Sequence, residues 1–246
     1  MSEDLCEYVL RLGDDALVAA QRLAQWCSRA PEMEEDIALA NIALDQLGVA
    51  RLLLTYAGEL EGMGRDEDAL AYLRSDREFR NCLLVELSNG DFGFTMVKLL
   101  FLSAYQKLLY DALVDVEDQR LAAIGAKARK ESAYHLDHSS LWTVRLGDGT
   151  EESHRRVQGS LDQLWPYTHE LFAPDDLHSR VNAVDPSTLR DEWLSIVERV
   201  LAEATLSRPA DGWAPGGGRS GRHTEALSYL LAEAQVVHRA HPGAQW

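Results

Sequence analysis

The stretch IALANIALDQLGVARLLL, residues 37–54, decides the fold of this chain. Its apolar residues recur at steps of three and four and cover almost the whole circumference of the helix that this spacing predicts. The predicted helix begins at Met33, ends near Leu60 and is followed by a break at Gly62 and Gly64. A helix that is apolar on nearly all sides is typical of the interior of a helical bundle.

Three further long helices are predicted from the same three- and four-residue spacing. They are expected over residues 2–29, 81–116 and 120–146. Gly90 and Gly93 lie inside the second of them and are expected to kink or interrupt it, since each costs about 1 kcal/mol relative to alanine in a helix. Helices of this length, each about 40 Å long, predict an extended four-helix bundle.

The chain beyond residue 150 is more broken, with shorter helices expected over 151–172, 185–206 and 223–239. The stretch SRPADGWAPGGGRSGR, residues 207–222, is rich in glycine and proline and is expected to be a mobile loop. The sequence therefore predicts an all-α single domain over residues 1–246. Its core bundle is expected over about 2–146 and additional helices over 151–246.

The charge and hydropathy of the chain argue against two classes of partner, nucleic acids and membranes. The 246 residues include 40 acids and 24 lysines and arginines, which gives a net charge of −16. This charge repels phosphate backbones and anionic lipid, so neither nucleic acid nor a membrane is expected as a partner. The amino terminus carries acids where a signal peptide carries bases, and no run approaches about 18 consecutive apolar residues. We therefore expect a cytoplasmic protein.

Carboxylates inside a long bundle suggest a di-iron site, which is built from a Glu on each of two helices and a Glu-x-x-His on each of the other two. Two positions test this pattern. Asp45, the only acid in the 37–54 run, is followed three residues later by Gly48, and Glu131 is followed by Tyr134. All eight histidines lie at or after His135, so the first three long helices contain none. A symmetric di-iron site cannot be built from this sequence.

A vestigial site remains a hypothesis. Its inner-face candidates are Asp45, Glu86, Glu131 and His135. Glu131 and His135 are one helical turn apart, and they form either a core pair or a single weak metal site. Lys98 lies in the apolar run MVKLLFLSAY and either neutralises one of these acids or extends to solvent. We expect no catalytic residue and no bound metal in this chain.

The glycine-rich part of the 207–222 loop is a second candidate site. Arg219 and Arg222 stand just before an expected helix start, where backbone N–H groups and arginine side chains together can bind phosphate. The same features also suit contact with an acidic partner surface, or a solvated linker. A contact with the phosphates of CoA or with a partner is the functional hypothesis for these two arginines.

Segments from nearly the whole chain resemble a known family, the C subunits of the bacterial ring-1,2-phenylacetyl-CoA epoxidases. The segments are YVLRLGDDALVAAQRLAQWC (8–27), APEMEEDIALANIALDQLGVAR (30–51), NCLLVELSNGDF (81–92), KARKESAYHLDHSSLW (127–142) and HTEALSYLLAEAQVVHRAHPGAQW (223–246). The resemblance implies a ferritin-like fold and a non-catalytic, structural role in the cytoplasm.

The resemblance also implies partners and cofactors. A homologous catalytic A subunit would hold the di-iron centre and the CoA thioester, and this chain would hold no cofactor. The complex would epoxidise the aromatic ring with O2 and with electrons delivered from NADPH through a flavin and iron–sulfur reductase. The expected partners are the A subunit, further subunits of the complex and possibly a second copy of this chain. Two alternatives stay open: a metal-binding oxygenase active in its own right, and a free-standing helical binding protein.

Overall fold

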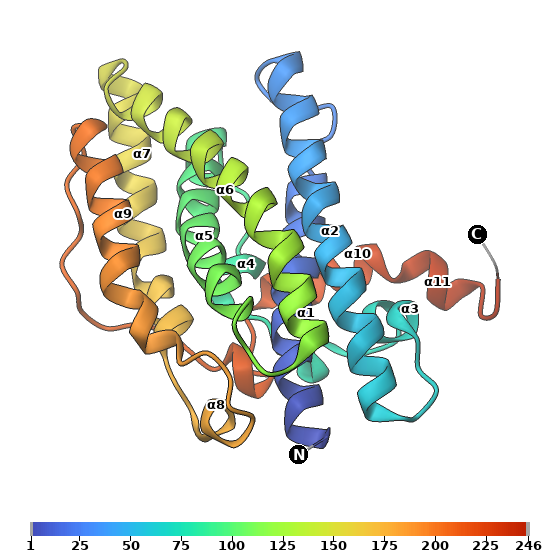
Figure 1. The fold of residues 1–246 in the computed structure, drawn as a ribbon. Helices are drawn as coiled ribbons and strands as arrows, with labels where there is room; N and C mark the ends of the chain where they lie inside the picture. Colours follow the sequence, from blue (N-terminus) through green and yellow to red (C-terminus); the bar gives the residue numbers. More distant parts are fainter. Residues whose placement is uncertain (1, 245–246) are drawn as a thin grey trace. The chain divides into compact units, whose positions relative to one another are not determined.

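A computed structural model describes residues 2–244, and within this range the chain contains helices and loops but no strand. The all-α prediction is confirmed. Contacts divide the chain into two compact units, one formed by Met1–Ser88 with Gly216–Trp246 and the other by Asn89–Pro215. Figure 1 labels the helices of both units.

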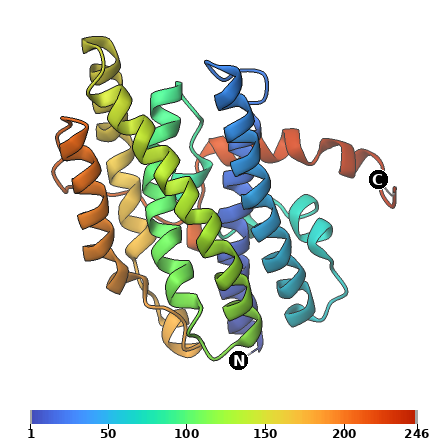
Figure 2. The same cartoon turned by 45° about the horizontal axis from the view of Figure 1, so that its top comes forward.

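A long helical hairpin forms the centre of the first unit. The helices α1 (Ser2–Ala24) and α2 (Met33–Glu61) lie side by side and run in opposite directions (Figures 1 and 2). Gly62 ends α2 in the left-handed conformation, with φ of 69°, and its N–H donates to the Gly58 carbonyl. Glycine adopts this conformation without the steric cost that a Cβ brings, which explains the predicted break.

The helix α2 is less buried than its composition predicts. One face packs against α1 with fully buried residues such as Leu39 and Leu53. Its other side exposes large apolar side chains to solvent, namely Met33, Ile37, Leu44, Leu47 and Leu52. The prediction of a helix enclosed on all sides is therefore corrected: α2 has a buried face and an exposed apolar one.

The composition of α2 has a second consequence. Among residues 2–244 it is the one helix long and apolar enough to cross a membrane, judged by length and composition alone. Core helices of soluble proteins pass the same test. Within the protein, 44% of its most apolar window is buried, so its apolar residues serve packing at least in part.

Short helices complete the first unit and bring the end of the chain back to its beginning. They are α3 (Glu67–Tyr72), η1 (Asp76–Glu78), α4 (Leu83–Glu86), η4 (Gly218–Ser220), α10 (Glu225–Ala234) and α11 (Val236–Ala240). The side chain of Asp66 caps α3 by accepting a hydrogen bond from the Ala69 N–H at 2.8 Å. The helix α10 contacts both α1 and η1, although it follows η1 only after a long stretch of intervening chain.

The second unit is built on another hairpin, formed by α5 (Phe92–Leu113) and α6 (Gln119–Gly147). The helices α7 (Glu151–Leu164) and α9 (Arg190–Glu203) pack against both of them. The intervening elements are η2 (Trp165–Phe172), α8 (Asp176–Arg180) and η3 (Pro186–Leu189). Trp193 anchors this core: it packs against Trp165 and Phe101, and its ring N–H donates to the Phe101 carbonyl at 2.9 Å.

The helix predicted over 81–116 is in fact two helices, α4 and α5, separated by residues 87–91. Gly90 lies in the left-handed region with φ of 60°, and Asp91 caps α5 by accepting a hydrogen bond from the Phe94 N–H at 2.9 Å. A capping residue inside an apolar run starts a new helix, because its side chain satisfies a backbone donor that the previous turn cannot. The predicted interruption is confirmed at Gly90, whereas Gly93 lies within α5.

The helices after residue 150 are divided between the two units. The helices α7 and α9 pack on the α5–α6 hairpin, whereas residues 216–244 belong with the first unit. That the two units form one domain over residues 1–246 stays a prediction. The two long hairpins are consistent with the ferritin-like fold, which is built from such pairs.

Two helical glycines allow a matched test of this packing. A Cβ on Gly58 in α2 would lie 2.2 Å from the Arg65 carbonyl oxygen, whereas a Cβ on Gly159 in α7 would have no atom within 4 Å. We expect Gly58→Ala to destabilise the protein by about 1–3 kcal/mol through overpacking, and Gly159→Ala to stabilise it by up to about 1 kcal/mol through helix propensity. Urea unfolding followed by circular dichroism measures both. Equal effects of the two substitutions would contradict the close approach of Arg65 to α2.

Candidate functional site

The first unit contains a cluster of charged side chains buried where residues 74–86 and 216–224 meet α1. We call it the anchor cluster and define it by Asp14, Asp15, Arg22, Arg74, Glu86, Arg219 and His223. Asp14 and Glu86 are completely buried, and Asp15, Arg22 and Arg74 are less than 10% exposed. Charges this deeply buried are tolerated only when they are paired and hydrogen-bonded.

Asp14 is paired with Arg74. The guanidinium of Arg74 donates to both carboxylate oxygens, with one of these hydrogen bonds at 3.0 Å. The Arg80 backbone N–H donates a third hydrogen bond, at 2.8 Å to Asp14 Oδ2. Arg74 also lies over the ring of Phe79, at 4.3 Å from its centroid. A single acid of α1 thereby fixes the segment that follows α3.

Asp15 is paired with Arg219, which comes from the far end of the sequence. The two guanidinium nitrogens of Arg219 lie 3.0 and 2.7 Å from the two oxygens of Asp15, and the Cys82 N–H donates to Oδ1 at 2.7 Å. Burial raises the pKa of Asp15, and the ion pair with Arg219 opposes that rise. Arg219 donates further hydrogen bonds to the carbonyls of Arg11 and Arg80.

Glu86 accepts hydrogen bonds on both carboxylate oxygens. Asn81 Nδ2 and His223 Nδ1 lie 2.8 and 2.6 Å from Oε2, and the Thr224 N–H donates to Oε1 at 2.6 Å. The backbone carbonyl of Glu86 accepts two more hydrogen bonds from Arg22. Glu86 thus holds α1, α4 and the start of α10 together.

The geometry around His223 fixes its protonation. Nδ1 lies 2.6 Å from Glu86 Oε2, and Nε2 lies 3.0 Å from the Phe79 carbonyl oxygen. A carbonyl and a carboxylate only accept, so an ionised Glu86 requires a proton on both ring nitrogens. Burial by itself lowers the pKa of His223, but the hydrogen bonds to Glu86 and Phe79 outweigh it and raise the pKa above its ordinary value. Both ring nitrogens therefore face acceptors, and this geometry favours the imidazolium form of His223 beside Glu86.

The anchor cluster contains two residues predicted from the sequence, Glu86 and Arg219, and a third, Arg222, lies next to it in the chain. Glu86 is buried as expected, but it lies on a short helix and binds the returning carboxyl-terminal segment. Arg219 is engaged by Asp15 and two carbonyls, and its contact with CoA phosphates or a partner stays a prediction. Arg222 is exposed, so its contact with a ligand or partner stays a prediction. The second half of the predicted mobile loop is fixed, since Gly218 is buried against the Asn81 carbonyl.

The other predicted inner-face residues lie on the long helices. Asp45 is half-buried on α2, and on α6 Glu131 is half-buried and His135 is buried. Lys98, 6% exposed on α5, donates a hydrogen bond to Asn89 Oδ1 at 3.2 Å, so extension to solvent is the wrong alternative. Residues 2–244 contain no group of three or more His, Cys, Asp or Glu side chains arranged to hold a metal ion. The described side chains thus do not fit a di-iron centre.

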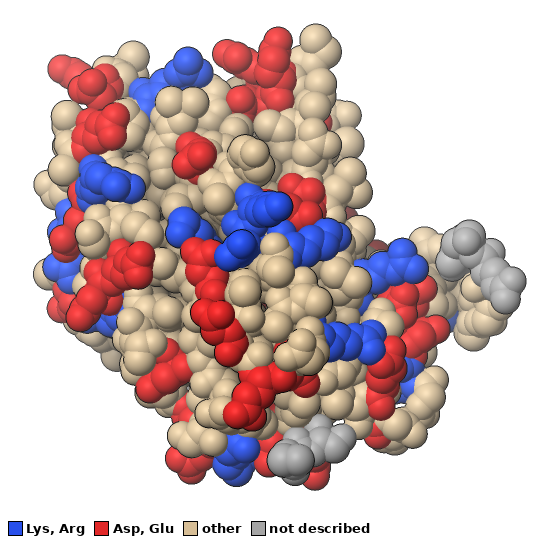
Figure 3. Space-filling model, in the orientation of Figure 1, with Lys and Arg blue, Asp and Glu red and all other residues tan. Residues whose placement is uncertain are grey.

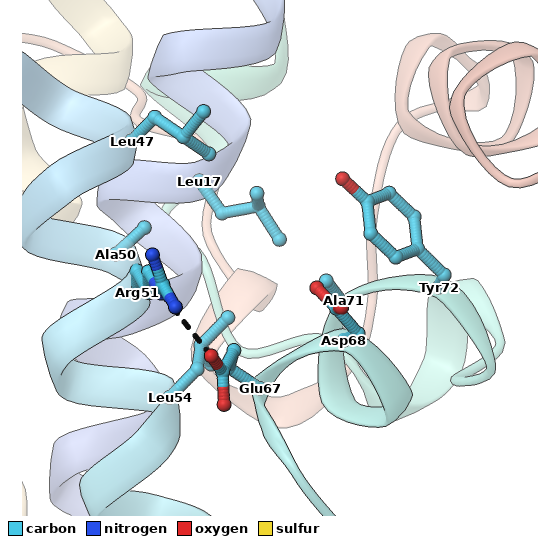
Figure 4. A pocket seen from close by; sticks show the side chains of 9 residues that line it. All are labelled: Leu17, Leu47, Ala50, Arg51, Leu54, Glu67, Asp68, Ala71 and Tyr72. Carbon is cyan, nitrogen blue, oxygen red and sulfur yellow. Dashed lines mark hydrogen bonds and ion pairs between the residues drawn. The ribbon is translucent and has the colours of Figure 1, made fainter. Parts of the chain in front are cut away.

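A pocket of about 320 Å³ opens between α2 and α3, with Leu17 of α1 in its floor (Figure 4). Its remaining lining residues are Leu47, Ala50, Arg51 and Leu54 of α2 and Glu67, Asp68, Ala71 and Tyr72 of α3. Arg51 and Glu67 form an ion pair at 3.2 Å across one end. The lining has an apolar floor and a charged rim but no histidine, cysteine or serine, so it suits binding better than catalysis.

Sequence reasoning did not identify the pocket, Asp14, Asp15 or Arg74 as functional. The adjacent acids Asp14 and Asp15 interrupt the apolar pattern of the first helix, and this was a signal of buried charge. Their partners were not predictable, because Arg74 and Arg219 lie 60 and 204 residues away along the chain. On the face shown in Figure 3, acidic and basic side chains are both spread over the surface, and several acidic groups stand apart from any base.

Removing Arg219 should reveal the cost of the buried Asp15 charge. We expect Arg219→Ala to lower the free energy of unfolding by about 3–5 kcal/mol, the usual effect of leaving one partner of a buried ion pair alone. Arg222→Ala, three residues further on at an exposed position, is the matched control and should change stability by less than about 0.5 kcal/mol. Urea unfolding curves give both values. A small effect of Arg219→Ala would show that Asp15 is neutralised in another way.

The His223–Glu86 pair should make stability depend on pH. Because the pKa of His223 is higher in the folded chain than its unfolded value of about 6.5, the stabilisation is fully present below that value and is lost as the pH rises through the folded pKa. The loss of unfolding free energy caused by His223→Gln should therefore be larger at about pH 6 than at about pH 9. With Glu86→Gln already in place, this pH dependence should flatten. If His223→Gln caused the same loss of unfolding free energy at both pH values in a chain that keeps Glu86, the charged pair would be refuted.

Comparison with known proteins gives the chain its relatives. The family model described as phenylacetic acid catabolic protein matches residues 1–246. The chain is 48% identical over 246 residues to the C subunit of 1,2-phenylacetyl-CoA epoxidase from Escherichia coli (strain K12), in an alignment that covers 98% of this chain and 99% of that protein. The resemblance to the C subunits is thereby confirmed. With the whole sequence matched and the all-α fold in agreement, this chain belongs to the phenylacetic acid catabolic protein family.

Proposed function

We propose that this chain is a non-catalytic structural subunit of a multicomponent phenylacetyl-CoA ring epoxidase, acting in aerobic phenylacetate degradation in the cytoplasm. It would pair with a catalytic A subunit that holds the di-iron centre. The observation that carries the proposal is the 48% identity, over nearly the full length of both chains, to a protein named as the C subunit of such an epoxidase. An alignment of this extent supports the same place in a related complex.

The chemistry of the described residues supports a non-catalytic role. An oxygen-activating di-iron site needs carboxylates and histidines converging from long helices. Here Glu86 already accepts hydrogen bonds from Asn81, His223 and Thr224, and the first three long helices α1, α2 and α5 have no histidine in their sequences. The pocket between α2 and α3 has no histidine, cysteine or serine in its lining, so it offers no histidine ligand for iron.

A bundle without metal can still support a partner, because helix packing rather than a metal provides its stability. The exposed apolar side chains of α2 in the first unit, and Tyr134 and Leu141 of α6 in the second, are of the kind that a neighbouring protein covers. An acidic chain with a net charge of −16 also favours association with more basic partners. These features favour a member of a complex over a free-standing binding protein.

The test is to purify this chain alone and after co-expression with the A subunit of the same organism, to separate complexes by size exclusion and to measure iron in each peak. We expect this chain alone to lack iron, and the complex to contain about two irons per A subunit, as the di-iron assignment implies. Ring epoxidation of phenylacetyl-CoA by the complex with its reductase should require this chain.

Two results would contradict the proposal. Two irons bound to this chain alone would support an oxygenase active in its own right. Elution of the two chains as separate peaks at micromolar concentration would support the free-standing binding protein. The variants Glu131→Gln and His135→Gln serve as controls for the metal measurement. A structural subunit should give the same iron content in the complex with either of them.

A further inference from the structure

The shape, burial and charge of the pocket between α2 and α3 favour one kind of occupant. Its floor is apolar and almost inaccessible, since Leu17, Ala50, Leu54 and Ala71 are each no more than 4% exposed. Its rim includes Leu47, which is 41% exposed, and Leu44 lies one helical turn before it at 63% exposed. An apolar floor that continues into exposed leucines gains free energy when an apolar group covers it.

The walls of the pocket are fixed before anything binds. The N-cap Asp66 begins α3, and the Arg51–Glu67 ion pair connects α3 to α2 at 3.2 Å. On the other side the ring of Tyr72 stacks on His238 of α11, with 5.4 Å between ring centroids. Figure 4 shows Leu47 and Tyr72 on opposite sides of the opening. A hollow formed in advance costs little conformational entropy to fill.

The charges around the pocket argue against a CoA thioester, and its apolar floor favours a protein side chain. The volume of about 320 Å³ is near the lower end of the range of about 300–1,000 Å³ typical of pockets for small-molecule ligands. Phosphates would need free cations, but Arg51 is already paired with Glu67, and Asp68 adds a further negative charge. The buried apolar floor suits a bulky apolar side chain of a partner.

The surroundings of the pocket are acidic. Between residues 61 and 68 the chain carries Glu61, Asp66, Glu67 and Asp68 against one base, Arg65. That base is itself paired with Glu61. The rim therefore complements a positive charge next to the apolar group that enters the pocket.

We propose that this pocket is the docking site for a bulky apolar side chain of another epoxidase subunit, presented on a segment that carries an adjacent Lys or Arg. The apolar side chain rests on Leu17, Leu54 and Ala71, and the basic group faces Asp68. This inference rests on the proposed function, since it takes the partner to be a subunit of the same complex. Anchors of this type, a buried apolar side chain with a charged neighbour, carry a large share of the binding energy of protein interfaces.

Two leucines of α2 provide a matched pair for the test. Leu47 and Leu52 are 41% and 39% exposed, but only Leu47 lines the pocket. The dissociation constant of this chain with the A subunit, and with each further subunit of the complex, is measured for the unmodified chain, Leu47→Glu and Leu52→Glu. We expect Leu47→Glu to weaken binding to one subunit at least about tenfold, and Leu52→Glu to change it less than about twofold.

A charge reversal gives an independent measurement on the exposed rim. Asp68→Lys should weaken the same complex, and this effect should shrink as salt is raised, because screening weakens interactions between exposed charges. Glu59→Lys, also exposed but outside the pocket lining, is its control and should have little effect. Circular dichroism verifies that each variant is folded, and the surface position of Asp68 keeps this variant informative if Leu47→Glu is unstable.

The outcomes separate the two proposals. If the unmodified chain binds no epoxidase subunit, the proposed function fails and this inference fails with it. If the unmodified chain binds, but the variants at Leu47 and Asp68 bind equally well, the pocket is not the docking site and the proposed function stands. An equal loss of binding for Leu47→Glu and Leu52→Glu would also overturn the inference, since the whole face of α2 would then be responsible. Selective loss at Leu47 and Asp68 would support it.

Discussion

The first unit depends on the neutralisation of two adjacent carboxylates in the middle of α1. Burying a carboxylate costs several kcal/mol, so a folded chain must bring a cation and several donors to each of Asp14 and Asp15. Arg74 and Arg219 supply the cations, and the N–H groups of Arg80 and Cys82 supply further donors. This requirement determines where residues 74–82 and the returning segment near 219 must lie.

The same requirement explains why a glycine-rich stretch is ordered. Arg219 reaches Asp15 only because Gly218 lies directly against the Asn81 carbonyl, where a Cβ would be 2.2 Å from the oxygen. Gly221 is in the left-handed region with φ of 72° and similarly approaches the Arg77 carbonyl. His223 then pairs with Glu86, so that α10 begins at a fixed point. The glycines here allow close packing of backbone against backbone rather than flexibility.

The two units are stabilised differently. Buried ion pairs hold chain segments of the first unit together, whereas packed aromatic side chains around Trp193 form the core of the second unit. The surface of the first unit adds an apolar face on α2 and, beside it, a pocket with an acidic rim. The chain belongs to the phenylacetic acid catabolic protein family, and exposed apolar surface of this kind suits contact with another protein.

The sequence alone determined the helical class, the approximate bounds of the long helices and the break near Gly90, because apolar spacing, caps and glycines act within a few residues of the chain. The spacing of Asp45, Glu131 and the late histidines already argued against a symmetric di-iron site. Only the tertiary structure decided that Arg219 forms an ion pair with Asp15, that Glu86 binds His223, and that a pocket lies between α2 and α3. These depend on pairs of residues far apart in the chain, and the local pattern of a sequence contains no information about which distant segment will supply the partner of a buried charge.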